Sequence, residues 1–233
     1  ANAYSYGPYG TELKNNIKAL WWKTFVHDRD EMVGMDGPIL LHPRLWEASG
    51  HTGGFNDAMV DCKKCQRRFR ADHLVEDATG QDLEGQLGAM TAALFEKKVP
   101  CPNCGESDWT EARNFNMMFK TEMNGITDDQ GNYVPVYLRP ETAGAIFSDF
   151  KNILDSMRVK VPFGIAQIGK AFRNEIVTGN FIFRLREFEQ MEIEYFCHPD
   201  DGLRLTDEWL ETWLAFYDEI GIPREKLHIL DIP

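Results

Sequence analysis

The sequence has 233 residues, of which 43% are hydrophobic, and this is enough to bury one large domain or a domain with an added module. Its formal net charge of -12 argues against a generic basic nucleic-acid coat, since phosphate binding draws on clustered Lys and Arg. The sequence contains neither an apolar run of about 18 residues nor an N-terminal signal pattern. We therefore expect a globular cytoplasmic protein that has no membrane partner.

A helix is the first element that the chain predicts. Its N-cap is expected at Thr11, after a Gly-Pro-Tyr-Gly turn, and its end at about Val26. Apolar residues recur with helical period at Leu13, Ile17, Leu20, Trp21 and Phe25. A short buried strand is then predicted over residues 37–41, and the glycine-rich residues 42–57 are predicted to form a loop.

Four of the five cysteines form two CxxC pairs, Cys62 with Cys65 and Cys101 with Cys104. This spacing lets two turns direct four thiolates at one ion, and a closed four-sulfur site is typical of structural zinc. Two disulfides or a redox CxxC are weaker alternatives. We therefore expect residues 58–111 to form a zinc-binding, ribbon-like insertion that folds around its metal and whose middle, residues 79–88, is polar and glycine-rich.

The second half of the chain predicts both strands and helices. A turn at residues 128–132 precedes a strand over residues 133–138, and Pro140 is predicted at the first position of a helix that ends near Met157. Residues 165–175 and 181–196 predict two strands around a short turn. A last helix is expected from an N-cap at Thr206 to the stop signals Gly221 and Pro223. The fold class is α+β, with a mostly antiparallel sheet.

The two strands around the turn carry charges in a period-two pattern. In the first strand, Arg173 and Glu175 share a face with small residues. In the second, Arg184, Arg186 and Phe188 share a face, and Glu187 and Glu189 fall on the opposite, mostly apolar face, where we expect them to support the hairpin from behind. Guanidinium groups beside a carboxylate and an aromatic ring suit a nucleotide. A solvated face with cross-strand ion pairs fits the same pattern.

Several segments carry a resemblance to a known family. FRNE, a loop and an RxxxFxxxE run resemble motif 2 of class II aminoacyl-tRNA synthetases. The closer similarity is to the dimeric type of glycyl-tRNA synthetase, on the segments YGPYGTELKNNIKALWWK, LHPRLWEASGH, DCKKC with FRADHL, FNMMFKT, YLRPETA, and KVPFGIAQIGKAFRNE through REFEQMEIEYF. The resemblance implies an antiparallel sheet flanked by helices. It divides the chain into residues 1–57 with motif 1, the insertion 58–111, and residues 112–233 with motif 2.

The resemblance also implies roles for individual residues. Arg173 would hold the α-phosphate of ATP, Glu175 the adenine amine, and Phe188 would stack on adenine; the first two are the expected catalytic residues. The full set of implied ATP contacts is Arg173, Asn174, Glu175, Phe183, Arg184, Leu185, Arg186, Glu187 and Phe188. The implied glycine contacts are Arg70, Glu141, Phe188, Glu189, Gln190, Met191 and Glu192.

The implied activity is that of a ligase in translation. Glycine would be activated with ATP and Mg²⁺ to glycyl-adenylate and then transferred to the 3' end of tRNA(Gly), by a homodimer that forms through the motif 1 region, residues 11–41. Where the family usually reads Gln-Gly after PETA, this sequence has Gly144 and Ala145. We expect the chain to be roughly the N-terminal half of a synthetase, with motif 3 and the anticodon-binding domain downstream of Pro233.

Two other functions are compatible with the sequence. One is a non-catalytic, synthetase-like module that binds nucleotides or partners and lacks motif 3. The other is a zinc-ribbon nucleic-acid binder, because the insertion has a local basic patch within an acidic chain. That patch consists of Lys63, Lys64, Arg67, Arg68 and Arg70.

Overall fold

The computed structural model describes residues 4–127, 129–176, 178–179 and 181–230, which divide into two compact units. The first unit comprises residues 39–140 and 171–188, and the second comprises residues 4–38, 141–170 and 189–230. We describe each unit by itself. Each unit is formed by separate stretches of the chain, so the chain passes from one unit to the other several times. The predicted division into three consecutive segments stays a prediction.

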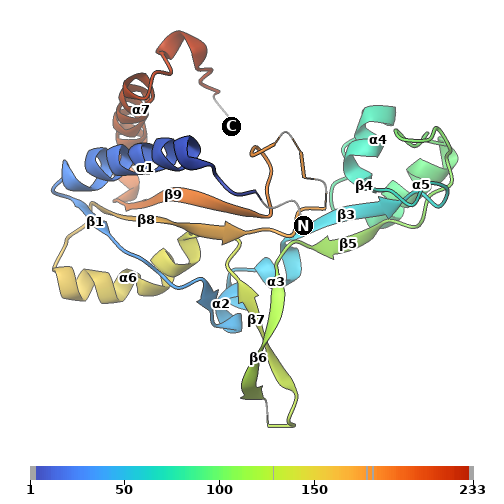
Figure 1. The fold of residues 1–233 in the computed structure, drawn as a ribbon, viewed down its shortest axis with the longest axis horizontal. Coiled ribbons are helices and arrows are strands. Elements are labelled where there is room, and N and C mark those ends of the chain that lie inside the picture. The colour runs from blue at the N-terminus through green and yellow to red at the C-terminus, as the bar shows by residue number, and fades with distance from the viewer. Residues whose placement is uncertain (1–3, 128, 177, 180, 231–233) are drawn as a thin grey trace. The chain divides into compact units, whose positions relative to one another are not determined.

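The second unit is built on a three-stranded sheet of order β1-β8-β9 (Figure 1). Strand β1 (Met32–Gly34) runs parallel to β8 (Phe163–Phe172), which pairs with β9 (Glu187–Phe196). Helix α1 (Pro8–Trp22), the π-turn Lys23–His27 and helix α7 (Gly202–Glu219) cover one face of the sheet. Helix α6 (Ala143–Met157) covers the other face.

Alternation along β8 divides its side chains between two cores. Ala166 packs with Trp21 and Phe25 under α1 and α7, whereas Ile165 packs with Ile146 of α6. All five side chains are fully buried. Period-two alternation therefore holds within β8, although Arg173 and Glu175, whose face was predicted from it, lie beyond the end of the strand. A strand that is covered on both faces reads as a nearly continuous apolar run.

The first unit contains two further three-stranded sheets, both antiparallel. One has the order β2-β7-β6, from Leu40–Leu41, Tyr133–Leu138 and Lys120–Thr127. The other has the order β4-β3-β5, from Arg68–Arg70, Asn56–Asp61 and Arg113–Asn116.

Helices α4 (Ala71–Thr79) and α5 (Leu87–Glu96) accompany the second of these sheets (Figure 1). Their buried side chains share a core with those of Cys62, Cys101 and Trp109. The Trp109 ring nitrogen donates a hydrogen bond to the Val99 carbonyl at 2.7 Å. The predicted cysteine-bounded insertion therefore has an apolar core of its own. Among the described helices of the chain, none combines the length and the apolar character that a membrane span requires.

The prediction of a loop over residues 42–57 is wrong. The segment contains α2 (Pro43–Ala48), α3 (His51–Gly54) and the start of β3. Pro43 occupies the first turn of α2, and the His42 ring accepts a hydrogen bond from the Arg44 amide at 3.2 Å. His is an uncommon capping residue, so the usual N-cap signals did not reveal this helix. The predicted buried strand at residues 37–41 is reduced to Leu40–Leu41, of which Leu40 is exposed.

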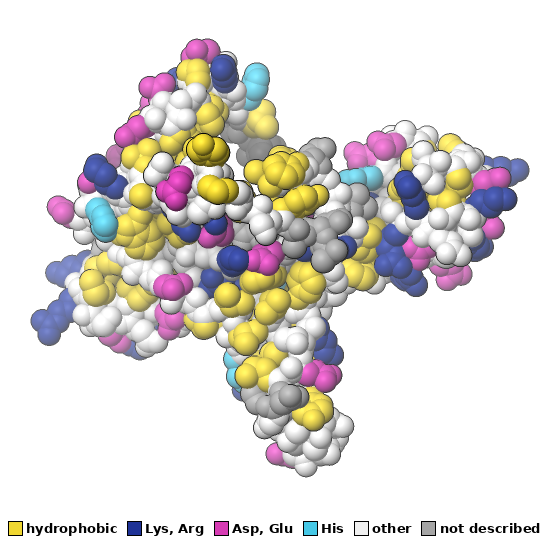
Figure 2. All heavy atoms as spheres, viewed as in Figure 1, with side chains coloured by type: hydrophobic (Ala, Val, Ile, Leu, Met, Phe, Trp, Pro, Cys, Tyr) yellow, Lys and Arg dark blue, Asp and Glu magenta, His cyan; other side chains and the backbone are white. Residues whose placement is uncertain are grey.

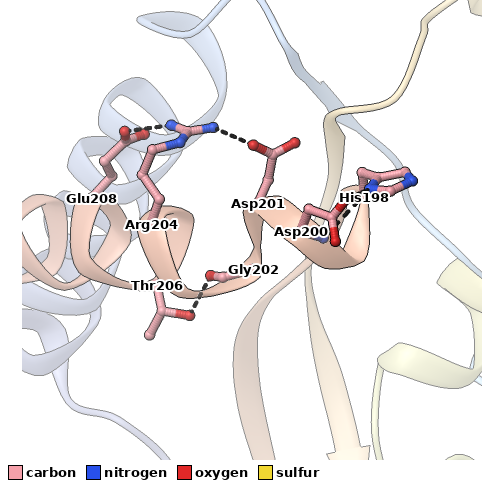
Figure 3. Close-up of polar contacts among 7 residues, drawn as sticks. All are labelled: His198, Asp200, Asp201, Gly202, Arg204, Thr206 and Glu208. Atoms are coloured by element: carbon pink, nitrogen blue, oxygen red, sulfur yellow. Dashed lines mark hydrogen bonds and ion pairs between the residues drawn. The ribbon is translucent and has the colours of Figure 1, made fainter.

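Three helix starts differ from their predicted positions. Helix α1 begins at Pro8, ahead of Thr11, because proline is pre-organised for the first turn. Helix α6 begins at Ala143, so Pro140 precedes it by three residues. Figure 3 shows Thr206 inside α7, where its hydroxyl donates to the Gly202 carbonyl at 2.9 Å; the helix begins at Gly202. The strand predicted over residues 133–138 is confirmed, and Asp128 of the predicted turn lies outside the described residues.

The hairpin strands are shorter than predicted, and the connection between them is longer. Residues 173–175 and 181–186 lie outside β8 and β9. The Asn174 amide donates to the Met117 carbonyl at 2.7 Å, so this stretch leaves the β8–β9 ladder. Phe181 has a φ of 56°, a left-handed conformation that ends an extended run. The prediction that residues 181–186 are part of a strand is therefore wrong, and the alternating faces predicted for these residues do not apply.

Candidate active site

Arg173 directly follows β8 in the first unit. Its Nε donates to the Pro140 carbonyl at 3.1 Å. Its guanidinium carbon lies 5.5 Å from the ring centre of Phe55 and 5.4 Å from that of Phe188. Within the described residues, the terminal nitrogens Nη1 and Nη2 have no hydrogen-bond partner. The guanidinium is thus held through its Nε atom and through two aromatic contacts. Its two terminal nitrogens, which can bind a phosphate bidentately, stay available to a ligand.

Glu175 lies two residues beyond Arg173 and is half-buried. The Arg186 side chain donates to the Glu175 carbonyl at 2.8 Å, and the Arg173 amide donates to the Arg186 carbonyl at 3.0 Å. Burial raises the pKa of the Glu175 carboxyl, and the nearby Asp57 adds to this shift, although the guanidinium groups of Arg184 and Arg173 oppose it. The fold therefore resists ionisation of a carboxyl group that stands among arginines.

Arg70 ends β4 and lies in the same unit. It forms ion pairs with Asp57, at 3.2 Å, and with Asp72, whose Oδ1 lies 3.1 Å from the Arg70 Nε. The hydrogen bonds that Arg70 donates to the Asp72 carboxylate raise the pKa of Arg70. Two carboxylates therefore already occupy this guanidinium, and its implied contact with glycine stays a prediction.

The connection between Arg173 and β9 places its apolar residues in different environments. Leu185 is buried, with 8% of its side chain exposed, whereas Phe183 is 82% exposed. Arg184 and Glu187 are also exposed. Asn174 is half-buried and fixed by its backbone bond to Met117. The implied ATP contacts of these residues stay predictions, and exposure leaves Phe183 and Arg184 accessible to a ligand.

The second unit contains a group of polar side chains around Thr142, which is fully buried at the start of α6. Its amide donates to the Gln190 side-chain oxygen at 3.2 Å, and its hydroxyl donates to the Glu192 carboxylate. Burial raises the pKa of Glu194, and the carboxylates of Glu192 and Glu141 raise it further. Negative charge is thus concentrated here, which favours a bound cation.

The opposite face of β9 carries Glu189 and Met191. Glu189 lies 2.8 Å from the Lys14 ammonium and 3.0 Å from that of Lys18. Burial acts to raise the pKa of Glu189, but these lysines lower it more. Met191 packs in the core under α1 and α7. Glu189 therefore lies on the face that alternation predicted, towards the lysines of α1. The role expected of Glu187 and Glu189 in supporting the hairpin, and the implied glycine contacts of Glu189 and Met191, stay predictions.

Ala145 stands where the resemblance to the family implies a glycine. A Cβ built on Gly37 would lie 2.4 Å from the Ala145 Cβ, so only glycine fits at residue 37. Gly144 and Ala145 are both buried in the first turn of α6. The exchange therefore places one methyl group against a glycine in the core of the second unit.

The four paired cysteines come together in the first unit, with all their Sγ atoms within 4.8 Å of one another. The Cys62 and Cys104 sulfurs lie 3.6 Å apart, and those of Cys65 and Cys101 lie 3.7 Å apart. Sulfurs around a tetrahedral zinc ion with bonds of about 2.3 Å would be about 3.8 Å apart, whereas a disulfide requires about 2.05 Å. The cluster fits a metal ion, and none of its cysteines is in a disulfide.

Both cysteine pairs are closed by the same backbone turn. The Gln66 amide donates to the Cys62 carbonyl at 2.8 Å, and the Gly105 amide donates to the Cys101 carbonyl at 2.9 Å. A hydrogen bond from the Arg67 backbone lowers the pKa of Cys65 to about 6. Burial and the neighbouring cysteine sulfurs raise the pKa of Cys104 to about 12. Without a cation, one thiol of the cluster therefore ionises readily and another resists ionisation, and a bound metal ion would allow both to be thiolates.

The basic patch of the insertion is largely neutralised. Lys63 pairs with Asp108 at 2.8 Å, Arg68 pairs with Asp61 at 2.6 Å, and Arg70 has the two partners given above. Figure 2 shows Lys and Arg side chains beside carboxylates on the module that carries α4 and α5. In the described part of the chain, Lys64 and Arg67 have no ion-pair partner.

Sequence reasoning assigned no role to Phe55, Asp57 or Thr142. Phe55 contacts Arg173, Asp57 pairs with Arg70, and Thr142 binds Glu192. Thr142 lies beside Glu141 in the PETA segment, but its hydroxyl donates to Glu192, fifty positions later in the chain, so its local sequence carried no signal for this contact. Phe55 lies in a glycine-rich stretch that gave no period, so its contact with a residue 118 positions later had no local signal.

Comparison with a model of the class II tRNA synthetase core domain (G, H, P, S and T) gives a match over residues 102–232. The chain is 50% identical over 237 residues to a glycine-tRNA ligase of Geobacillus thermodenitrificans, and 49% identical over 237 residues to that of Alkaliphilus oremlandii. These alignments cover 99% of this chain but 50% and 51% of the relatives. The chain thus spans about half the length of the curated relatives that it matches.

Two solved structures share the fold. One is described as the RNA binding domain of threonyl-tRNA synthetase from Cryptosporidium parvum, with a TM-score of 0.58, 17% identity, and coverage of 94% of this chain and 38% of that one. The other is Giardia lamblia prolyl-tRNA synthetase in complex with prolyl-adenylate, with a TM-score of 0.54, 16% identity, and coverage of 94% and 31%. At these identities the likeness concerns the fold alone, and it confirms the expected synthetase-like α+β class.

Proposed function

The chain belongs to the class II tRNA synthetase core domain family, and from this membership we propose that it is part of the catalytic domain of a glycine-tRNA ligase. The observation that carries the proposal is the identity of about 50% with glycine-tRNA ligases over 99% of the chain. In this reaction the glycine carboxylate attacks the α-phosphorus of ATP. Pyrophosphate leaves, and the glycyl group then passes from the adenylate to the 3'-terminal adenosine of tRNA(Gly).

Arg173 is the proposed phosphate ligand. Its fork has no partner among the described residues, and its other edge is fixed by the Pro140 carbonyl. A pre-oriented guanidinium stabilises the charge that develops on the α-phosphate without reorganisation during the reaction. Phe188 would offer its ring to adenine, and the Glu175 carboxylate would accept a hydrogen bond from the adenine amine. Mg²⁺ would accompany the nucleotide and neutralise its phosphates.

The acidic group of the second unit is the proposed ammonium site. Glu192 is oriented by the buried Thr142 hydroxyl, and Glu141 and Glu194 add negative charge. Glycine is the smallest amino acid, so a tight site excludes every competitor by size. Editing is not expected, because no smaller amino acid can be accepted by mistake.

The cysteine cluster is the proposed structural zinc site. Cys62, Cys65, Cys101 and Cys104 would hold the ion through four thiolates, which leaves no coordination position for a substrate. Zinc there would supply folding energy to the insertion. We also propose a homodimer through residues 11–41, tRNA(Gly) as the partner, and the cytoplasm, where translation takes place, as the location.

Glycine-dependent exchange of pyrophosphate into ATP tests the proposal. The measurement needs the full-length protein that contains this chain, with glycine compared against alanine and serine. Exchange that requires glycine and is negligible with the larger amino acids is the expected result. A protein that binds ATP but shows no exchange with any amino acid would instead be the non-catalytic module, and the proposed function would be wrong.

A further inference from the structure

Phe55 lies between α3 and β3, far along the chain from Phe188, the other ring that contacts Arg173. The ring centre of Phe55 is 5.5 Å from the guanidinium carbon, nearly the same distance as that of Phe188. We propose that Phe55 is a positioning residue for Arg173: it holds the guanidinium in the orientation that receives the α-phosphate. This inference rests on the proposed function, because it assigns Phe55 a role in the same reaction.

A backbone relay ties Phe55 to the segment that carries Arg173. The Met117 amide donates to the Phe55 carbonyl at 3.0 Å, and the Asn174 amide donates to the Met117 carbonyl at 2.7 Å. Phe55 and the residue after Arg173 are thus two hydrogen bonds apart, through Met117, which is itself buried. The ring and the guanidinium therefore keep their spacing through the backbone as well as through their own contact.

The α2–α3 segment provides a second contact of the Phe55 ring. The His51 ring lies 5.4 Å from that of Phe55 and 5.3 Å from that of Trp46, which is fully buried. The Asn116 side chain donates to the backbone carbonyls of His51 and Thr52, at 3.2 and 3.1 Å. Three rings are thus in consecutive contact, from the buried Trp46 through His51 to Phe55, and these contacts restrict the orientation of the Phe55 ring.

Phe55 and Phe188 differ in what else they are expected to do. The proposed function assigns the Phe188 ring to adenine, so a substitution of Phe188 would disturb the adenine contact together with the contact to Arg173. Phe55 has no assigned ligand, and its contact with Arg173 can persist when ATP is bound. A cation–π contact of this kind is worth about 0.5 to 2 kcal/mol, which corresponds to a change of about 2- to 30-fold in a rate or binding constant.

The test measures pyrophosphate exchange in the full-length protein with Phe55→Leu. We expect kcat/KM for ATP to fall about 2- to 30-fold, and KM for glycine to stay within about twofold of the wild-type value. Phe55→Tyr keeps the ring and should restore activity to within about twofold. Phe55→Met keeps a similar volume without a ring and should behave as Phe55→Leu, which covers the case in which the leucine variant does not fold.

Phe115→Leu is the matched control. Phe115 is a half-buried ring of the same unit, and the Arg68 guanidinium carbon lies 5.9 Å from its centre. The substitution therefore removes a comparable cation–π contact that does not involve Arg173. It should leave kcat/KM for ATP unchanged. Wild-type activity in Phe55→Leu and Phe55→Met, or an equal loss in Phe115→Leu, would overturn this inference alone. Absence of exchange in the wild-type protein would overturn the proposed function together with it.

Discussion

The cysteine cluster and the surroundings of Arg173 belong to the same unit but satisfy their polar groups differently. The four sulfurs lie within 4.8 Å of one another and are enclosed by two identical turns, so one ion would complete them. Arg173 is held by an edge and two rings and keeps its terminal nitrogens available within the described residues. A complete set of metal ligands stabilises the module that carries it. A side chain that is held in one orientation but keeps donors available can bind a substrate without reorganisation.

The charges around the two sites show the same contrast. Near the cluster, Lys63 and Arg68 have carboxylate partners at 2.8 and 2.6 Å. Near Arg173, burial raises the pKa of Glu175, so the fold disfavours its charged form. A carboxyl group that is kept in such a place at a cost in stability is typical of a functional site.

Breaking the cluster is expected to have the largest effect on stability. Cys62→Ser, or a strong chelator, should remove about one bound zinc per chain and unfold the insertion, to whose folding a structural zinc site can contribute on the order of 10 kcal/mol. Metal analysis and thermal melting measure this. Cys197→Ser, outside the cluster, is the control. Wild-type melting of Cys62→Ser, with no zinc in the wild-type protein, would show that the cluster needs no metal.

Glu175→Gln should have a smaller effect and should separate stability from activity. Loss of a charged hydrogen-bond acceptor, worth about 1.5 to 3 kcal/mol, should reduce exchange about 10- to 100-fold. The same substitution should raise the melting temperature at neutral pH, because it removes an ionisation that the fold resists. Glu225→Gln, at an exposed site, should change neither. A lowered melting temperature would contradict this account of Glu175.

The pH dependence of Glu175 follows from its raised pKa. Between the ordinary value of 4.5 and the raised value, the folded state binds more protons than the unfolded state, so stability falls as the pH rises. The stability gain of Glu175→Gln should therefore be complete above the raised pKa and vanish below 4.5. Melting of both proteins across this window measures it. A gain that is independent of pH would rule out ionisation as its cause.

The basic patch should show the smallest effect. Lys64 and Arg67 lack ion-pair partners in the described part of the chain, so replacing both with Ala tests whether they bind tRNA phosphates. We expect affinity for tRNA to fall a few-fold and the salt slope of log affinity to decrease by about one to two. Lys151→Ala, at an exposed site that pairs with Asp155, is the control. An unchanged salt slope would mean that the patch is only solvated.

The sequence predicted the parts of this molecule that repeat a local rule. Period-two alternation holds along β8, where Ile165 and Ala166 lie in different cores, and cysteine spacing located the cluster. It failed where distant contacts decide the conformation. Residues 173–175 leave β8 because the Asn174 amide bonds to Met117, and α2 forms behind a His cap that propensity does not favour. The partners of Arg173 come from three separate segments, so the candidate site could be predicted only in part.

The central claim is that Arg173 is an oriented ATP ligand and not a structural residue. Its most direct test compares Arg173→Ala with Arg204→Ala in glycine-dependent pyrophosphate exchange and thermal melting. Arg204 is an exposed arginine that joins Asp201 and Glu208 on α7 (Figure 3). We predict that Arg173→Ala loses about 10²- to 10³-fold in exchange while its melting temperature falls by only a few degrees, because one hydrogen bond and two ring contacts are lost, and that Arg204→Ala keeps wild-type exchange. Wild-type exchange in Arg173→Ala would contradict the account.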